Sequence, residues 1–380
     1  MSETRRERRG AGGADPVGEP QPGSRRAYAR DAGLEHAADV EHRAPAAATP
    51  STPTPGGATR GSLRAAAHTG AEVGATGATR ATGATRITRR AVPDDLTSPR
   101  RASLRQRSFI GTIKALDSLA SAGAHMSVRV NDVDTGAEVL TGDDHLTLPI
   151  GGIGIVPLLI EVAAQIEFGQ LDPYEIIRRD AIESVGVAGI WQHLQAPALP
   201  VLDLAVLAAA ASDAAAANAL LQRVGLRAVR ARMDDIGLVR TALLDRFRDV
   251  RGPDDAPHVA ISSAGELAAL FAAIVNARVV SPAVSAQVGE WLNLNQDLAL
   301  VGAATALDPF AHEDDRHRLL FVNKTGRTGG IRAEAGVLAG PRAGVAYALI
   351  VGFDDLSMGH RLRAHDAFRA LGADLMEYVH

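Results

Sequence analysis

The sequence contains no cysteine and almost no lysine. Without cysteine among its 380 residues, the chain can form no disulfide, thiolate nucleophile or cysteine-ligated metal site, although this absence does not fix the redox compartment. Lysine occurs only at Lys114 and Lys324, because arginine supplies nearly all of the positive charge. A lysine inside a motif of this chain therefore carries more information than it would in an ordinary composition.

The sequence also lacks the long apolar runs of leaders and membrane spans. No signal peptide is recognisable in the first forty residues, so we expect a cytoplasmic protein, and secretion would require a different start of translation. A bilayer span needs about 18 uninterrupted apolar residues. Residues Ile150 to Ala164 come closest, but Glu161 and the glycines within this run favour a buried helix.

Composition changes sharply near residue 105. Residues 1–103 are rich in Arg, Ala, Gly, Thr and Pro and poor in branched apolar side chains, so they cannot bury enough surface to fold. We expect a disordered basic arm. It could contact a polyanion, but the scarcity of aromatic residues favours a solvated linker, and nucleic acid is not an expected partner. Hydrophobic residues make up 46% of the chain and its net charge is -4, so we expect residues 104–380 to fold around a sizeable apolar core.

Hydrophobic periodicity predicts strands at both ends of this domain and helices between them. Strands at the two ends would each be marginal alone, so we expect them to share one sheet in a single α/β (α+β) unit. The predicted strands are Met126–Val130, Ala137–Leu140, Arg318–Val322, Ile331–Leu338 and Gly344–Val351, and the predicted helices are Leu104–Ala122, Val156–Phe168, Asp203–Ala211, Ala214–Val224, Ser263–Ala277 and His360–Val379.

Two short motifs carry chemical information. Lys324-Thr325-Gly326 follows a predicted strand, with a glycine pair at residues 329 and 330. Ser212-Asp213-Ala214 lies about a hundred residues upstream, between two alanine-rich helices, with Asn218 four residues later. Either motif alone is weak, but their order and separation make the combination more specific.

A third stretch, residues 148–157, completes the pattern. It follows two strands and a turn, contains Pro149, and leads into the apolar helix. The three features together resemble class A β-lactamases and penicillin-binding proteins, over essentially Leu104 to His380. The nearest likeness is to actinobacterial serine-hydrolase relatives, which share features such as Gly189–Leu194 and Asp245–Arg251. The resemblance implies an antiparallel sheet built from both chain ends, packed against an all-helical domain.

The nucleophile of that family is missing here. The resemblance places a serine three residues after the proline and a lysine three residues further on, where this chain has Gly152 and Ile155. The family hydrolyses β-lactams through a serine acyl-enzyme, and removing such a catalytic pair costs roughly a million-fold in rate. We therefore expect a catalytically impaired member that retains a pocket for a β-lactam or a D-Ala-D-Ala-like small molecule. The candidate pocket residues are Gly152, Ser212, Asp213, Lys324, Thr325, Gly326 and Arg332.

Other interpretations of these residues stay open. Ser212 or Thr325, activated by a neutral Lys324, could make the chain an active ester or amide hydrolase. The chain could instead be a non-enzymatic protein that binds a partner through its basic arm. Arg332 could pair with a ligand carboxylate, or with Glu334 or solvent. Asp245 and Asp249 lie where the family carries its deacylating loop, but a solvated loop is the favoured interpretation there.

The sequence predicts no cofactor and no metal site. Among the 12 histidines, the pairs at residues 312 and 317 and at residues 360 and 365 are each five apart, so neither pair shares a helix face. Neither pair has a clear third ligand. The oligomeric state cannot be read from these patterns.

Overall fold

A computed structural model describes residues 109–380, except residues 184, 186–188, 315 and 356. The predicted disordered arm over residues 1–103 lies outside the described residues, as do the first five residues of the predicted opening helix.

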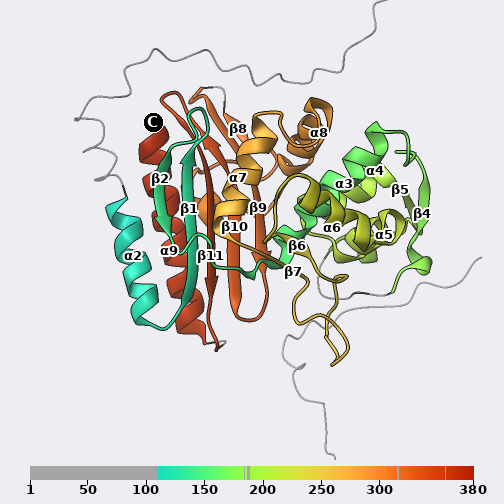
Figure 1. Ribbon diagram of the computed structural model, residues 1–380, viewed down its shortest axis with the longest axis horizontal. Helices are drawn as coiled ribbons and strands as arrows, with labels where there is room; N and C mark the ends of the chain where they lie inside the picture. Colours follow the sequence, from blue (N-terminus) through green and yellow to red (C-terminus); the bar gives the residue numbers. More distant parts are fainter. Residues whose placement is uncertain (1–108, 184, 186–188, 315, 356) are drawn as a thin grey trace, which may run out of the picture. The chain divides into compact units, whose positions relative to one another are not determined.

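Strands from both ends of the chain form one antiparallel sheet, as predicted. Its order is β2-β1-β11-β10-β9-β8, and each neighbouring pair runs antiparallel (Figure 1). The first and last strands of the sequence thus meet in the middle of the sheet, where β1 pairs with β11. The strands are β1 (His125–Asp132), β2 (Glu138–Gly142), β8 (Glu313–Asp314), β9 (Leu319–Arg327), β10 (Ile331–Ala339) and β11 (Gly344–Gly352).

Both faces of the sheet are covered. All nine residues of β11 are buried, which requires apolar neighbours on two sides and explains its uninterrupted apolar sequence. Tyr347 and Leu349 join the apolar cluster beneath α2 (Ile110–Ser121) and α9 (Met358–Val379), whereas Ala348 and Ile350 join the larger cluster of the helical region. Helix α7 (Ala264–Val275) lies against this second face, as Figure 1 shows.

The helical region is built around α3 (Ile155–Glu167). Eleven of its 13 residues are buried, because α4, α5, α6 and α8 all pack against it. Its one buried carboxylate, Glu161, accepts hydrogen bonds from Arg232 and Gln165, so the charge is paired. The surrounding helices are α4 (Val201–Ala211), α5 (Ala214–Val224), α6 (Leu226–Asp235) and α8 (Pro282–Leu292).

Short elements connect the sheet to these helices. The structure contains 3-10 turns at Gly151–Gly154, Arg179–Ala181, Trp191–His193 and Val301–Ala304. A three-stranded sheet consists of β3 (Leu148–Pro149), β6 (Ala242–Leu243) and β7 (Ala260–Ser262), and β4 (Ile176–Arg178) pairs with β5 (Ala198–Pro200).

Predicted helices and observed helices agree closely where capping signals were clear. Ser263, the first residue of the predicted helix, caps α7 by accepting a hydrogen bond from the Glu266 backbone N–H. Helices α6 and α8 were not predicted. Helix α6 is rich in charged side chains, which obscure an apolar period. For α8, the signals in the sequence were the cap Ser281 and Pro282 at the first helical position. Within the described ranges, no helix is both long and apolar enough to cross a bilayer.

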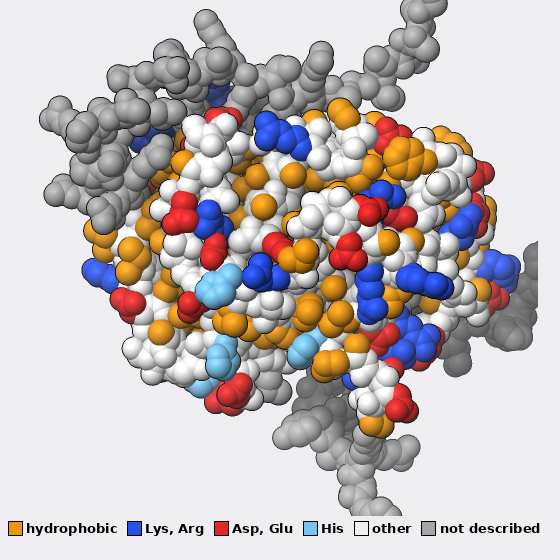
Figure 2. Space-filling model, viewed as in Figure 1, with side chains coloured by type: hydrophobic (Ala, Val, Ile, Leu, Met, Phe, Trp, Pro, Cys, Tyr) orange, Lys and Arg blue, Asp and Glu red, His pale blue; other side chains and the backbone are white. Residues whose placement is uncertain are grey.

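The outer surface carries charge of both signs. On the face drawn in Figure 2, basic and acidic side chains are interspersed and hydrophobic side chains lie between them. The described residues on this face therefore form no large patch of a single charge.

Candidate functional site

Three glycines let residues 151–154 lie directly against β9 and β7. A Cβ on Gly152 would lie 3.0 Å from the carbonyl oxygen of Thr325, and one on Gly154 would lie 2.5 Å from the Cβ of Ala260. Gly151 has φ +53° and an equally close neighbour in the Arg327 backbone. Close packing against β9 and β7 therefore accounts for the glycines of residues 151–154, which we call the glycine turn.

The glycine turn forms part of a cavity of about 1070 Å³. The cavity lies where the turn, the α4–α5 junction, β9 and the loop over residues 247–259 come together. Of the predicted pocket residues, Gly152, Ser212 and Thr325 line it, together with Ile155. Ser212 is the nearest side chain to the empty Cβ position of Gly152, at 3.8 Å from its Oγ. The structure thus brings together segments that are more than a hundred residues apart in sequence.

Ser212 occupies the junction between α4 and α5 in a left-handed conformation, with φ 51° and ψ 41°. This conformation is uncommon for a residue other than glycine, and it ends α4 abruptly. Its Oγ lies 2.6 Å from the Nζ of Lys324 and accepts a hydrogen bond from it. The hydroxyl hydrogen of Ser212 consequently remains available to an acceptor in the cavity.

Lys324 is completely buried directly behind Ser212. Its Nζ donates to three oxygens: the carbonyl of Ala209 at 2.7 Å, the hydroxyl of Ser212 at 2.6 Å and the Oδ1 of Asn295 at 3.2 Å. Three acceptors match the three N–H groups of an ammonium. Burial lowers the pKa of Lys324 to about 7. The charge of Asp297 opposes this shift, and the charge of Arg327 adds to it.

A row of buried amides continues from Lys324 to a buried acid. Asn295 donates to Asn323 at 2.9 Å, and Asn323 donates to the Oε1 of Glu334 at 2.7 Å. Glu334 accepts two further hydrogen bonds, from the Tyr347 hydroxyl at 2.8 Å and the Val301 backbone N–H at 2.7 Å. Burial raises the pKa of Glu334 to about 7, although these hydrogen bonds oppose the shift. We call this row, Lys324-Asn295-Asn323-Glu334, the buried relay.

Thr325 faces the cavity beside a second acidic group. Its hydroxyl donates to the Oδ2 of Asp297 at 2.5 Å, and the same carboxylate forms an ion pair with Arg327. Burial alone would raise the pKa of Asp297, but the hydrogen bond from Thr325 and the charge of Arg327 outweigh it, and the pKa falls below its ordinary value. The Thr325 hydroxyl therefore has a firm partner and is not poised to attack.

Asp213 serves the architecture. Its Oδ1 accepts from the Ala216 backbone N–H and caps α5, while its Oδ2 accepts from the backbone N–H groups of Ile190 and Trp191. The side chain is 1% exposed and does not line the cavity. Asp213 thus joins the α4–α5 junction to the Gly189–Leu194 segment, which explains why the sequence features at both places occur together.

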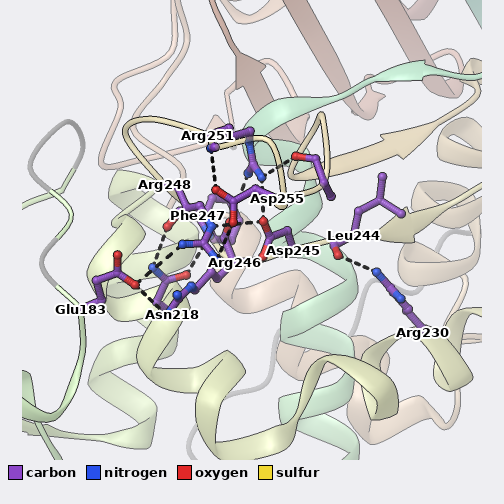
Figure 3. A network of polar contacts seen from close by, with 12 residues as sticks. Glu183, Asn218, Arg230, Leu244, Asp245, Arg246, Phe247, Arg248, Arg251 and Asp255 are labelled. Carbon is purple, nitrogen blue, oxygen red and sulfur yellow. Dashed lines mark hydrogen bonds and ion pairs between the residues drawn. The ribbon is translucent and has the colours of Figure 1, made fainter.

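The loop over residues 245–251 is held by internal ion pairs (Figure 3). Asp245 accepts from Arg248 at 3.2 Å and Arg251 at 2.8 Å, and the Asn218 side chain bonds to both backbone groups of Phe247. The neighbouring arginine charges and hydrogen bonds lower the pKa of Asp245 although burial opposes this shift. Asp245 therefore fixes the loop, while Asp249 lies at the cavity lining.

Gly326 and Arg332 are also placed outside the cavity lining. Gly326 lies beneath the glycine turn, where a Cβ would be 1.8 Å from the carbonyl oxygen of Ile150. Arg332 lines a separate cavity of about 220 Å³ and donates to the carbonyls of Thr328 and Ile331. The suggested pairing of Arg332 with Glu334 is wrong, because the Glu334 side chain is committed to the buried relay.

Sequence reasoning missed Asn295, Asp297 and Asn323 near Lys324, and it considered Glu334 only as a partner of Arg332. Asn295 and Asp297 come from the loop after α8, and Asn323 and Glu334 interrupt the apolar pattern of β9 and β10. Polar side chains inside otherwise buried strands were the available signal, because such groups require partners. No cluster of potential metal ligands occurs among the described residues.

Comparisons with known proteins agree with the fold. The sequence profile of the beta-lactamase enzyme family matches residues 109–379. No curated protein matches the chain. Among solved structures, the chain is similar to a β-lactamase from Sphaerobacter thermophilus, with 20% identity and a TM-score of 0.59 over 69% of this chain and 95% of that chain.

Two further structures show the same relationship. A β-lactamase from Xanthomonas campestris pv. campestris has 17% identity and a TM-score of 0.57, covering 73% of this chain and 98% of that one. An acyl-enzyme complex of PBP-A with penicillin G has 17% identity and a TM-score of 0.56, covering 70% of this chain and 96% of that one. At such identities these structures establish a shared fold, and the predicted fold is confirmed.

Proposed function

The chain belongs to the beta-lactamase enzyme family, and on that basis we propose that its cavity binds a β-lactam or a D-Ala-D-Ala-like small molecule without forming an acyl-enzyme. The observation that carries this proposal is the position of Gly152, which faces Ser212 across the cavity lining and has no hydroxyl. The binding groups are those of Ser212 and Thr325, with Lys324 behind them.

The surroundings of Gly152 support the loss of acyl transfer. Acyl transfer needs a nucleophile next to a general base. Ile155, one turn after Gly152, is an apolar side chain that lines the cavity and is 1% exposed, so it supplies no base. Lys324 is the donor in three hydrogen bonds, to Ala209, Ser212 and Asn295, so its ammonium hydrogens are already occupied.

Ligand binding has separate support. Ser212 can donate its hydroxyl hydrogen into the cavity, and Arg327 at the cavity lining carries a positive charge that is 49% exposed. A carbonyl or carboxylate oxygen of a ligand matches both groups. The binding is therefore expected to depend on Ser212 and to weaken as salt concentration rises.

The proposal is tested with full-length protein and penicillin G. We expect saturable binding by calorimetry, no burst of hydrolysis with a chromogenic β-lactam, and an unchanged intact mass after prolonged incubation. Ser212→Ala should weaken binding about tenfold, the equivalent of one hydrogen bond to a polar ligand group. A mass increase equal to the intact drug would overturn the non-covalent mechanism, and absence of binding by the wild-type protein would overturn the ligand assignment.

A second candidate function is ester or amide hydrolysis by Ser212. It is favoured by one observation, the 2.6 Å contact between Ser212 and a lysine whose pKa burial lowers to about 7. In that case Lys324 would take the Ser212 proton above pH 7, and turnover of an activated ester would rise with pH and vanish in Ser212→Ala. Unchanged turnover in that variant would exclude it.

A further inference from the structure

Two opposite charges are buried on neighbouring strands without touching each other. Lys324 in β9 and Glu334 in β10 are each 0% exposed, and no direct contact between their side chains occurs within the described part of the chain. A buried charge needs compensation by a counter-charge or by oriented dipoles. The buried relay lies between the two residues and supplies such dipoles.

All hydrogen bonds of the relay point in one direction. Lys324 donates to the oxygen of the Asn295 amide, the nitrogen of that amide donates to the oxygen of Asn323, and the nitrogen of Asn323 donates to Glu334. Each amide thus turns its negative end toward the lysine and its positive end toward the carboxylate. This arrangement stabilises an ammonium at one end and a carboxylate at the other.

The remaining contacts fit the same charge state. The hydrogen-bond partners of Glu334, namely Asn323, Tyr347 and the Val301 backbone, all donate to it, as an ionised carboxylate requires. The three hydrogen-bond partners of Lys324 all accept from it. The other charged or titratable groups that act on the two residues are Asp297, which raises the pKa of both, Arg327, which lowers the pKa of Lys324, and Tyr347, which donates to Glu334.

We propose that Glu334 is the counter-charge of Lys324, and that it acts through Asn323 and Asn295 to hold the lysine as an ammonium that keeps Ser212 an acceptor. Glu334 is then a positioning residue, because it lies outside the cavity lining and reaches Ser212 only through other side chains. Through this chain it determines that the Ser212 hydroxyl hydrogen points to the cavity. The proposal does not depend on which molecule the cavity binds.

The sequence makes this proposal directly measurable. The full-length protein has only two lysines, so lysine labelled with ¹³C at Cε gives two resonances, one from buried Lys324 and one from exposed Lys114 on α2. The pH titration of each resonance reports its own ammonium. Lys114 serves as the internal reference in every sample.

Glu334→Gln removes the negative charge and nearly preserves the shape of the side chain. We expect the titration midpoint of Lys324 to fall by about one pH unit, as expected for loss of an opposite charge at medium range. The matched control is Glu161→Gln, which neutralises another buried carboxylate, in α3, whose partners are Arg232 and Gln165. The Lys324 midpoint should stay unchanged in that control.

Tyr347→Phe provides a second route if Glu334→Gln does not fold. It removes one donor from Glu334 and keeps the ring that stacks on Phe321 at 6.4 Å, so folding should persist. A carboxylate with fewer donors is protonated at higher pH, and the Lys324 midpoint should again fall, by about half a unit. An unchanged midpoint in either folded variant, or an equal shift in Glu161→Gln, overturns the proposal.

Discussion

Two parts of the cavity lining differ in how their residues are tied to the fold. Ser212 is held by Lys324, which is buried behind it, and Thr325 is held by Asp297, which is half-buried at the cavity lining, so each hydroxyl has a partner. The glycine turn and Ile155 carry no polar side chain and are placed by backbone packing and burial alone. Replacing a polar side chain of the buried network leaves its hydrogen-bond partners unsatisfied. A side chain added at residue 152 would face the cavity and would leave no partner unsatisfied.

Lys324→Met is the largest disruption of the polar part of this lining. It leaves Glu334 buried without its counter-charge and removes the donor to Ala209 and Asn295, so the free energy of unfolding should fall by about 4 kcal/mol. Urea unfolding monitored by circular dichroism measures this change. The matched control is Lys114→Met, at an exposed position, which should stay within about 0.5 kcal/mol of the wild type. A loss below about 1 kcal/mol at Lys324 would show that the network is dispensable.

Stability should also depend on pH through the same polar part. Burial raises the pKa of Glu334 from 4.5 to about 7, so its contribution to stability is fully present below pH 4.5 and is lost as pH rises through 7. Burial lowers the pKa of Lys324 from 10.5 to about 7, so its contribution is present above pH 10.5 and is lost as pH falls through 7. The contribution of Glu334 is smallest above pH 7 and that of Lys324 is smallest below pH 7, so their sum is smallest near neutrality.

Glu334→Gln separates these two effects. The unfolding free energy of wild type minus variant should decrease by roughly 3 kcal/mol between pH 4.5 and 7, from the size of the pKa shift. Lys324→Met should remove the alkaline slope instead. Urea midpoints measured across pH 4 to 10 test both expectations, and a wild-type curve that is flat between pH 4.5 and 7 would contradict the assignment to Glu334.

Gly152→Ser changes the glycine turn and so tests the other part of the lining. The new Cβ would lie 3.0 Å from the Thr325 carbonyl, so the turn must shift by a few tenths of an ångström, at a cost of about 1 kcal/mol. Intact mass after penicillin G treatment should stay unchanged, because Ile155 still provides no base. Gly265→Ser, with a similar 3.1 Å contact to the Asp144 carbonyl, is the control for the stability change. A drug-sized mass increase in Gly152→Ser would show that a hydroxyl alone restores acylation.

Arg327→Gln should have the smallest effect. The Arg327 side chain is 49% exposed, so its ion pair with Asp297 is screened by solvent and contributes about 0.5 kcal/mol or less. Thermal unfolding at low and high salt should give nearly equal melting temperatures for the variant and the wild type. A loss of unfolding free energy as large as that expected for Lys324→Met would mean that the exposed Arg327–Asp297 ion pair contributes as much to stability as the buried relay.

Much of the fold could be predicted because its elements alternate clearly in sequence. The break between α4 and α5 at Ser212 and the start of α7 after Ser263 follow from residues next to them in sequence. The sheet from both chain ends follows because the strands at each end would be marginal alone. Strand β9 was predicted to end at Val322, because Asn323 and Lys324 interrupt its apolar pattern. It continues to Arg327, since the backbone pairing with β10 persists through Lys324 opposite Ala335. Hydrogen bonds of the backbone outweighed the side-chain pattern there.

The sequence by itself determined the family resemblance and the residues at its motif positions. The motifs around Lys324 and Ser212 and the stretch around Gly152 carry that resemblance, because the residues of a motif stand close together along the chain. Only the tertiary structure decided which of these residues share a cavity, that Asp213 caps a helix, and that Lys324 is linked to Glu334. Hydrogen bonds between residues far apart in sequence leave no periodic pattern, so their partners emerge only when the strands and loops are placed side by side.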